Sequence, residues 1–210
     1  MPLPPGTATG LRPGQRNLSI NSTGGVLFHG GNLFTHAELQ AMRMDGLMTH
    51  VCGKSYVRTD QPATPAIRAQ SAINSVPRSL HRRVALARQS AAWVYGCAPA
   101  PALVSLVTDH RRRTTALPAF SDAVMHQVTL GPCDLRSIGG VEVTSPLRTA
   151  LDIAIHGQDP WAVVALQNIA ASPELRCPLH LVVLSLESSS RIPGKSRALG
   201  RLREALRGVS

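Results

Sequence analysis

The sequence predicts an α+β protein, in which a small N-terminal helix-and-hairpin module precedes an α/β domain with a small mixed sheet and C-terminal helices. Two observations indicate this class. Apolar runs of strand length alternate with turn residues in the middle of the chain, and stretches with helical periodicity occupy its last third. Because aromatic residues make up only 3% of the 210 residues, the core is expected to consist mainly of Ala, Val, Leu and Ile.

Three segments follow from the composition. Residues 1–25 are expected to form a disordered lead, because Pro, Gly, Thr, Ser and Asn dominate them and bury little surface. Residues 26–62 then form the N-terminal module, and residues 63–210 form the α/β domain. No run approaches the length of about 18 uninterrupted apolar residues that a membrane span needs. We therefore expect a cytoplasmic protein without membrane contact.

The N-terminal module is predicted to hold a helix followed by a β-hairpin. Thr35 is a helix N-cap, Glu38 completes a capping box, and the pair Asp45-Gly46 ends the helix. The runs "LMTHV" and "SYVRT" then flank the turn "CGK". A helix and a basic hairpin form the closing half of a winged helix, but the two preceding helices are hard to place in Gly-rich residues 21–32.

The α/β domain is predicted to begin with a helix that has Thr64 as its N-cap and Pro65 at its first position. A basic stretch, the apolar run "VALA" and a short helix carrying Trp93 follow. The runs "ALVSLVT", "DAVMHQVTL" and "GGVEVT" read as strands, with "LRSI" as a candidate fourth. Helices are expected at about 159–171, 178–188 and 195–207, the last with Arg197, Arg201 and Arg203 pointing away from its apolar face.

Positive charge concentrates at the two ends of the chain. Residues 1–95 carry ten Arg or Lys and three Asp or Glu, and residues 191–210 carry six and one. Residues 96–190 carry six and eight. A partner rich in phosphate fits this layout, although a general preference for Arg would produce it too. Three consecutive arginines at a predicted strand end are candidate phosphate contacts, or else a solvated basic turn: Arg111, Arg112 and Arg113.

No cofactor or metal is expected from the motifs. The four cysteines have no CxxC spacing, and both Gly-Lys-Ser triplets lack the first glycine of a phosphate-binding P-loop. A metal-dependent nuclease would need clustered carboxylates and a lysine. Asp134 and Glu142 have plausible spacing for such a site, but Thr144 stands where the lysine belongs.

The stretch "VTSPLRTALDIAIHG" is predicted to run from a strand into a helix, with Ser145 as N-cap and Pro146 at the first helical position. Arg148, Asp152 and His156 would share one face of this helix. Arg148 and Asp152 are spaced for an ion pair, so a structural role is favoured over partner contact or catalysis. The inward stripe is expected to comprise Leu147, Leu151, Ala154 and Ile155.

Several of these stretches together resemble actinobacterial AbiEi-type antitoxins of type IV toxin-antitoxin systems, which act in abortive infection. The resemblance covers roughly residues 26–207, and its most specific motifs are "SAAW" with "YG" and "TSPLRT" followed by Asp152. It implies a winged-helix domain that binds operator DNA and represses transcription of its own operon. The family alignment makes five residues the candidate DNA contacts: His36, Gln40, Arg43, Lys54 and Arg58.

The resemblance further implies a C-terminal antitoxin domain and a nucleotidyltransferase-like toxin as partner, without a stable complex between the two. The leading hypothesis is thus a non-enzymatic, DNA-binding antitoxin and transcriptional autorepressor. A nuclease-like or nucleotide-processing enzyme is one alternative. An orphan structural or interaction domain from a decayed operon is another.

Overall fold

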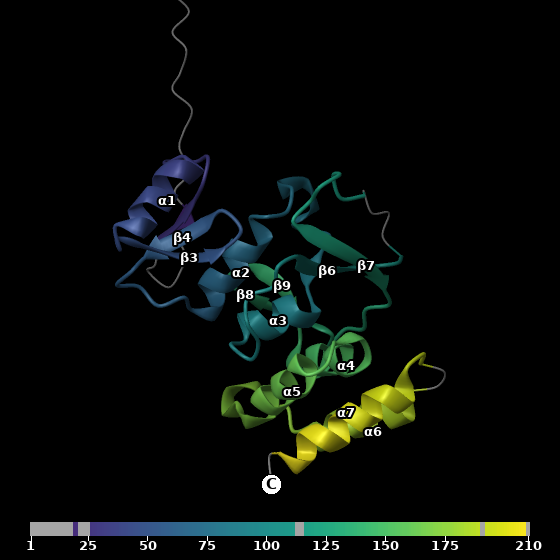
Figure 1. The fold of residues 1–210 in the computed structure, drawn as a ribbon. Helices are drawn as coiled ribbons and strands as arrows, with labels where there is room; N and C mark the ends of the chain where they lie inside the picture. Colours follow the sequence, from purple (N-terminus) through teal and green to yellow (C-terminus); the bar gives the residue numbers. More distant parts are fainter. Residues whose placement is uncertain (1–18, 21–25, 112–115, 190–191, 209–210) are drawn as a thin grey trace, which may run out of the picture.

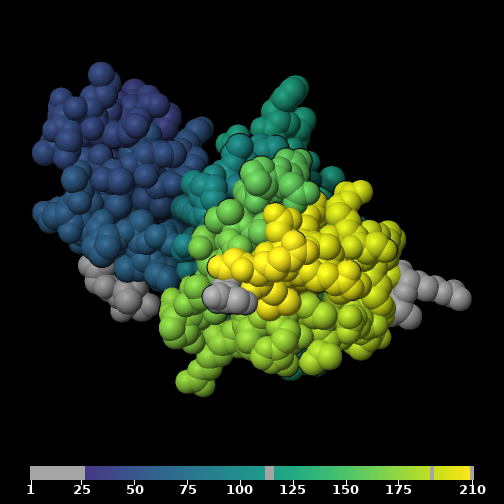
Figure 2. All heavy atoms as spheres, turned by 60° about the horizontal axis from the view of Figure 1, so that its bottom comes forward, coloured from purple at the N-terminus to yellow at the C-terminus, as the bar shows by residue number. Residues whose placement is uncertain are grey.

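The structure, a computed structural model, describes residues 19–20, 26–111, 116–189 and 192–208. It has the α+β fold that the sequence predicts. A small sheet with one helix forms the N-terminal module, a mixed sheet with helices on one face lies in the middle, and the C-terminal helices pack below it (Figure 1). Figure 2 shows that the N-terminal module projects at one side of the molecule, away from the C-terminal helices.

The first sheet has the strand order β1-β2-β4-β3, and all its pairs are antiparallel. Its strands are β1 (Ser19–Ile20), β2 (Val26–His29), β3 (Met48–Cys52) and β4 (Ser55–Arg58). The predicted hairpin is confirmed as β3–β4. The prediction that residues 1–25 are a disordered lead is wrong at Ser19–Ile20, because these two residues pair with β2; the rest of that segment lies outside the described residues.

One helix, α1 (His36–Met44), connects β2 to β3. Its predicted capping box is confirmed: the Glu38 amide donates to the Thr35 hydroxyl, and the Thr35 amide donates to the Glu38 carboxylate. The last elements of a winged helix are a strand, a helix and a two-stranded hairpin, in that order along the chain. The second strand of the hairpin pairs with the strand that precedes the helix. Within the described part of this module α1 is the single helix, so the module is an abbreviated version of that fold.

The second sheet is mixed, with the order β7-β6-β5-β9-β8. β6 pairs in parallel with β7, and β5 pairs in parallel with β9, whereas the other two pairs are antiparallel. The predicted strands are confirmed, including "LRSI", but the central β5 was missed because only two of its residues pair. The strands are β5 (Ala85–Leu86), β6 (Val104–Asp109), β7 (Ala123–Val128), β8 (Leu135–Ile138) and β9 (Val141–Thr144).

Six further α-helices complete the described fold: α2 (Pro65–Ile73), α3 (Arg88–Val94), α4 (Pro146–His156), α5 (Trp161–Ala171), α6 (Leu179–Ser188) and α7 (Lys195–Arg207). Two short 3-10 turns, η1 (Arg78–Leu80) and η2 (Pro173–Leu175), connect them. The predicted caps of α2 and α4 are confirmed, since Thr64 and Ser145 each accept a backbone N–H. No single described helix is long and apolar enough to cross a membrane; α5 and residues 173–188 together pass the length and composition test only as a pair bent by 79°.

Two expectations about helix faces are each wrong at one residue. In α4, Ala154 is buried and Leu151 and Ile155 pack against the core as expected, but Leu147 is exposed. The buried residues of α4 are Thr149, Ala150, Asp152, Ile153 and Ala154. In α7, Arg201 is buried and does not point away from the apolar face. Its guanidinium donates to the Asp159 carboxylate at 2.8 Å and to the Ala154 carbonyl at 2.9 Å. Arg201 therefore ties α7 to the end of α4.

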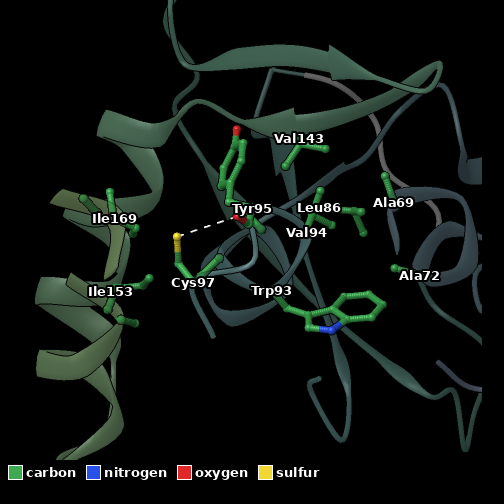
Figure 3. Packing of buried hydrophobic residues seen from close by; sticks show 14 of the residues in the cluster. Ala69, Ala72, Leu86, Trp93, Val94, Tyr95, Cys97, Val143, Ile153 and Ile169 are labelled. Atoms are coloured by element: carbon green, nitrogen blue, oxygen red, sulfur yellow. Dashed lines mark hydrogen bonds between the residues drawn. The ribbon is translucent and has the colours of Figure 1, made fainter. Parts of the chain in front are cut away.

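α3 is the centre of the hydrophobic core. Its residues from Ser90 to Val94 are all buried, and it packs against α2, α4, β6 and β9. In Figure 3 the side chains around α3 come from α2 (Ala69 and Ala72), from the sheet (Leu86 and Val143) and from the C-terminal helices. Tyr95 follows α3 and donates its hydroxyl to the Thr144 carbonyl at 2.6 Å. This bond joins the end of α3 to the end of β9.

The N-terminal module and the α/β domain share this core. Leu27, Val51 and Val57 of the module belong to the same buried cluster as Ile67 and Ile73 of α2. α2 contacts β2 and β3 on one side and α3 on the other. The predicted boundary near residue 62 is therefore a change of sheet and not a break in the packing.

Replacing Val57 by Ala is expected to destabilise the whole chain by about 2 kcal/mol, because it leaves a cavity in the shared core. Urea unfolding followed by the fluorescence of Trp93, which is buried in the other half of the molecule, should show a single transition at lower urea when it is measured in a Trp161→Phe background. Val164→Ala, at a residue that is 52% exposed, is the control and should leave that transition in place. An unchanged Trp93 transition in Val57→Ala would mean that the module unfolds separately.

Candidate functional site

Two of the predicted DNA contacts lie on the outer side of α1. Gln40 and Arg43 are exposed there. His36 is instead half-buried, with its ring 5.9 Å from the ring of Tyr56 and its Nδ1 3.5 Å from the tyrosine hydroxyl. His36 therefore helps to hold α1 on the sheet, which leaves Gln40 and Arg43 as the predicted contacts of α1 that are open to a partner.

The other two predicted contacts lie on the hairpin. Lys54 is exposed in the turn, whereas Arg58 is exposed but pairs with Asp60 at 2.7 Å. The turn is docked against the end of α2: Gly53 has φ +55°, and a Cβ there would come within 2.7 Å of the Ser75 hydroxyl. Only glycine fits this position, because both its backbone conformation and the available space exclude a side chain. Lys54 is thus held close to the segment that follows α2.

The N-terminal module itself is electrically neutral. Residues 26–62 contain three basic residues and three acidic residues. The exposed positive charge of this half of the molecule comes instead from the turn that contains η1, where Arg78, Arg82 and Arg83 are all exposed. We name the surface formed by Lys54, Arg78, Arg82 and Arg83 the basic edge. It lies where the hairpin turn meets the chain leaving α2.

A cavity of about 520 Å³ adjoins the basic edge. It lies on the face of the second sheet that α2 and α3 leave open, and its floor includes Val107, Leu130 and Leu135. Arg82, Arg83 and Arg111 line it together with Asp109 and Glu142. The cavity therefore combines an apolar floor with a mainly cationic rim.

Arg111 is already paired. Its guanidinium donates to both carboxylate oxygens of Asp109, at 3.0 and 2.7 Å, and to the Leu130 carbonyl at 2.9 Å. These bonds lower the pKa of Asp109 to about 2. Arg111 is thus fixed to the end of β6, and a phosphate would have to compete with Asp109. Arg112 and Arg113, the other candidate phosphate contacts, lie outside the described residues.

The expected contact between Arg148 and Asp152 is present within α4, at 3.0 Å. Arg148 also donates to the Asp134 carboxylate at 2.7 Å and to the Thr129 carbonyl at 3.1 Å. Its side chain is only 17% exposed. Burial disfavours the charged guanidinium, but the carboxylates of Asp152 and Asp134 outweigh it and raise the pKa of Arg148. Arg148 therefore connects α4 to the segment between β7 and β8.

Asp152 is buried, with only 6% of the residue exposed. Burial raises the pKa of its carboxyl group above the ordinary value, although Arg148 and Arg88 both oppose this. One oxygen accepts from Arg148, and the other, Oδ2, is buried without a hydrogen-bond partner among the described residues. Asp152 thus depends on nearby cations, and removal of Arg148 would leave most of its charge uncompensated.

Asp134 and Glu142, the pair weighed as nuclease carboxylates, have different surroundings. Asp134 is bonded to Arg148 and accepts the Gly131 amide, whereas Glu142 is exposed on β9. Among the residues that the structure describes, no group of three or more His, Cys, Asp or Glu is arranged to hold a metal ion. Asp134 is therefore better described as a partner of Arg148.

His156 lies one turn after Asp152 in α4, and burial lowers its pKa, followed by the charges of Arg88, His126 and Arg148. His156 lines a second cavity, of about 270 Å³, together with Arg88 and His126. Sequence reasoning missed this group, because Arg88, His126 and His156 come from three separate segments that only the tertiary fold brings together. The backbone at Arg88 has the unusual φ of +52°, but the sequence around this residue does not reveal that conformation.

The chain matches no protein-family model, and no curated protein is significantly similar to it in sequence.

Replacing Arg148 by Ala is expected to cost about 3 kcal/mol, because it leaves Asp152 buried without its main cation. Asp152→Ala should cost less, about 2 kcal/mol, because Asp134 still balances Arg148. Urea unfolding measures both values, with Glu187→Ala on the surface of α6 as a control expected to change little. Equal stability of all three variants and the unmodified chain would contradict a structural role for the pair.

The cost of Arg148→Ala should also depend on pH. Without Arg148 the pKa of Asp152, already raised by burial in the folded protein, rises further above its unfolded value. Folding then favours the protonated acid, so the variant regains stability relative to the unmodified chain as the pH falls from about 7.5 to about 5. A cost that stays constant over this range would show that Asp152 does not titrate there.

Proposed function

We propose that this chain is a DNA-binding, antitoxin-like regulator of transcription in the cytoplasm. The observation that carries the proposal is the position of the hairpin turn. The hairpin turn that carries Lys54 contacts Ser75, and the exposed arginines of the η1 turn begin three residues further along the chain, at Arg78. Hairpins of this kind contact the DNA backbone next to the helix that lies in the groove.

The distribution of charge indicates which surface attracts the DNA phosphates and which one offers contacts to bases. α1 offers Gln40 and Arg43, whose side chains can donate to base edges or phosphates, but the module around it has no net charge. Phosphate attraction therefore comes mainly from the basic edge. No second helix accompanies α1 within the described part of the module, so we expect the phosphate contacts to dominate affinity and sequence preference to be modest.

The antitoxin part of the proposal rests on the family resemblance. In this view the α/β domain counteracts a nucleotidyltransferase-like toxin without forming a stable complex with it, and the chain itself carries out no catalysis. Two features support a binding role over the nuclease alternative. Asp134 is engaged with Arg148, and among the described residues no group of three or more His, Cys, Asp or Glu is arranged to hold a metal ion.

Binding to DNA from the upstream region of the gene should be salt-dependent, with log Kd changing linearly with log salt. Lys54→Ala and the double variant Arg82→Ala/Arg83→Ala should weaken binding to all sequences and reduce the salt slope by about one for each phosphate that is no longer neutralised. Fluorescence anisotropy with a labelled duplex measures both quantities. Arg203→Ala, which removes one positive charge from the exposed side of α7, is the matched control for Lys54→Ala.

Two results would overturn this proposal. One is the absence of binding at low salt by the unmodified chain. The other is an equal reduction of affinity in Arg203→Ala and in the basic-edge variants, because that would indicate a general effect of net charge and not contact at the basic edge.

A further inference from the structure

The second cavity is lined by one basic residue from each of three separate elements. Arg88 comes from the start of α3, His126 from β7 and His156 from the end of α4. Ser105 and Trp161 complete the wall, beside the start of α5. The cavity has a volume of about 270 Å³ and is separate from the basic edge and its cavity, with which it shares no lining residue.

Arg88 lies close enough to Asp152 for the charge of each residue to shift the pKa of the other, but the three basic side chains are otherwise not engaged by the described residues. Arg88, His126 and His156 form no hydrogen bond or ion pair with any described residue, in contrast to Arg111, Arg148 and Arg201, whose guanidinium groups are each paired. Arg88 is also half-buried and has φ +52°, a conformation that costs a residue with a side chain energy. A half-buried, strained and unpaired arginine suggests that its guanidinium has a partner outside the chain.

The electrostatic surroundings are those of an anion site. Burial lowers the pKa of His126, and Arg88 lowers it further. Burial likewise lowers the pKa of His156, followed by Arg88, His126 and Arg148. The three side chains therefore repel positive charge on one another, and a bound anion would relieve this repulsion.

The nearby carboxylates are shared with other arginines. Asp152 attracts Arg88 electrostatically but is hydrogen-bonded to Arg148, and Asp159 pairs with Arg201. Together Arg88 and Arg148 carry two positive charges, against two negative charges on Asp134 and Asp152. The net charge of these four residues is therefore zero. Protonation of both histidines would raise the net charge to two positive charges, which a bound dianion would neutralise.

We propose that this cavity binds a phosphate group, either inorganic phosphate or the phosphate of a small monoester, held by Arg88, His126 and His156. A guanidinium and two imidazoles, which come from three separate elements, offer several donors and so suit a tetrahedral group with several acceptor oxygens. The volume exceeds that of phosphate alone, so a monoester fits, and Trp161 offers an aromatic surface to the rest of such a ligand. This site is additional to the proposed DNA contact and does not depend on it.

Calorimetric titration of the full chain with inorganic phosphate and with adenosine monophosphate distinguishes the two sources. Adenosine is titrated as a further control. Tighter binding of adenosine monophosphate than of either phosphate or adenosine would identify a monoester as the ligand. Equal binding of phosphate and adenosine monophosphate would identify the free ion. Arg88→Gln and the double variant His126→Gln/His156→Gln should each weaken binding by about tenfold or more. Arg203→Gln and His180→Gln, which remove exposed side chains of the same types elsewhere, are the controls and should bind normally.

A second measurement needs no variant. In the unmodified chain, NMR titration of the histidine ring protons should show the pKa of two histidines rising when phosphate is added. Sulfate, whose charge is constant in this range, should bind more tightly at about pH 6 than at about pH 8 because the histidines must be protonated. Absence of binding by either phosphate ligand, or binding that survives in Arg88→Gln and leaves the histidine pKa values unchanged, would overturn the proposal.

Discussion

The fold depends on the complete burial of one short helix. α3 has small residues at Ser90, Ala91 and Ala92, and these allow α2, α4 and the second sheet to approach it closely on all sides. Close packing gains dispersion energy only where the surfaces fit, so a sequence poor in aromatic residues can still form a dense core around such a helix. Tyr95 then closes the arrangement with its bond to Thr144. Both sheets are positioned relative to α3, the first through α2 and the second directly.

Charged side chains connect the outer parts to this core. Arg148 joins α4 to the connection between β7 and β8, and Arg201 joins α7 to α4. Each guanidinium binds both a carboxylate and a backbone carbonyl, which satisfies donors that would otherwise be buried at a cost. Arg88 is the exception on this side of the molecule: it is near Asp152 but bonded to nothing in the described chain. Arg148 and Arg201 are hydrogen-bonded within the fold and are structural cations, whereas Arg88 has no hydrogen bond to a described residue and belongs to the candidate ligand site.

Local sequence signals predicted most of the elements. The caps at Thr35, Thr64 and Ser145, and the turn at Gly53, act over three or four residues and could be recognised directly. The two-residue strand β5 and the buried side of α4 could not, because their environment is set by segments distant in the chain. The exposed position expected for Arg201 on α7 was wrong for the same reason, since a charged residue is predicted to be exposed until its buried partner is known. The second cavity depends entirely on tertiary contacts.

The continuity of the core between the two sheets limits how the N-terminal module can evolve. Leu27, Val51 and Val57 share their buried surface with α2, so a different module exchanged for residues 26–62 would have to reproduce that apolar surface to be accommodated. Exchange of the whole module is therefore restricted to segments that match the apolar surface of α2. New specificity would have to arise by point substitution at exposed positions such as Gln40 and Arg43, with the scaffold inherited unchanged.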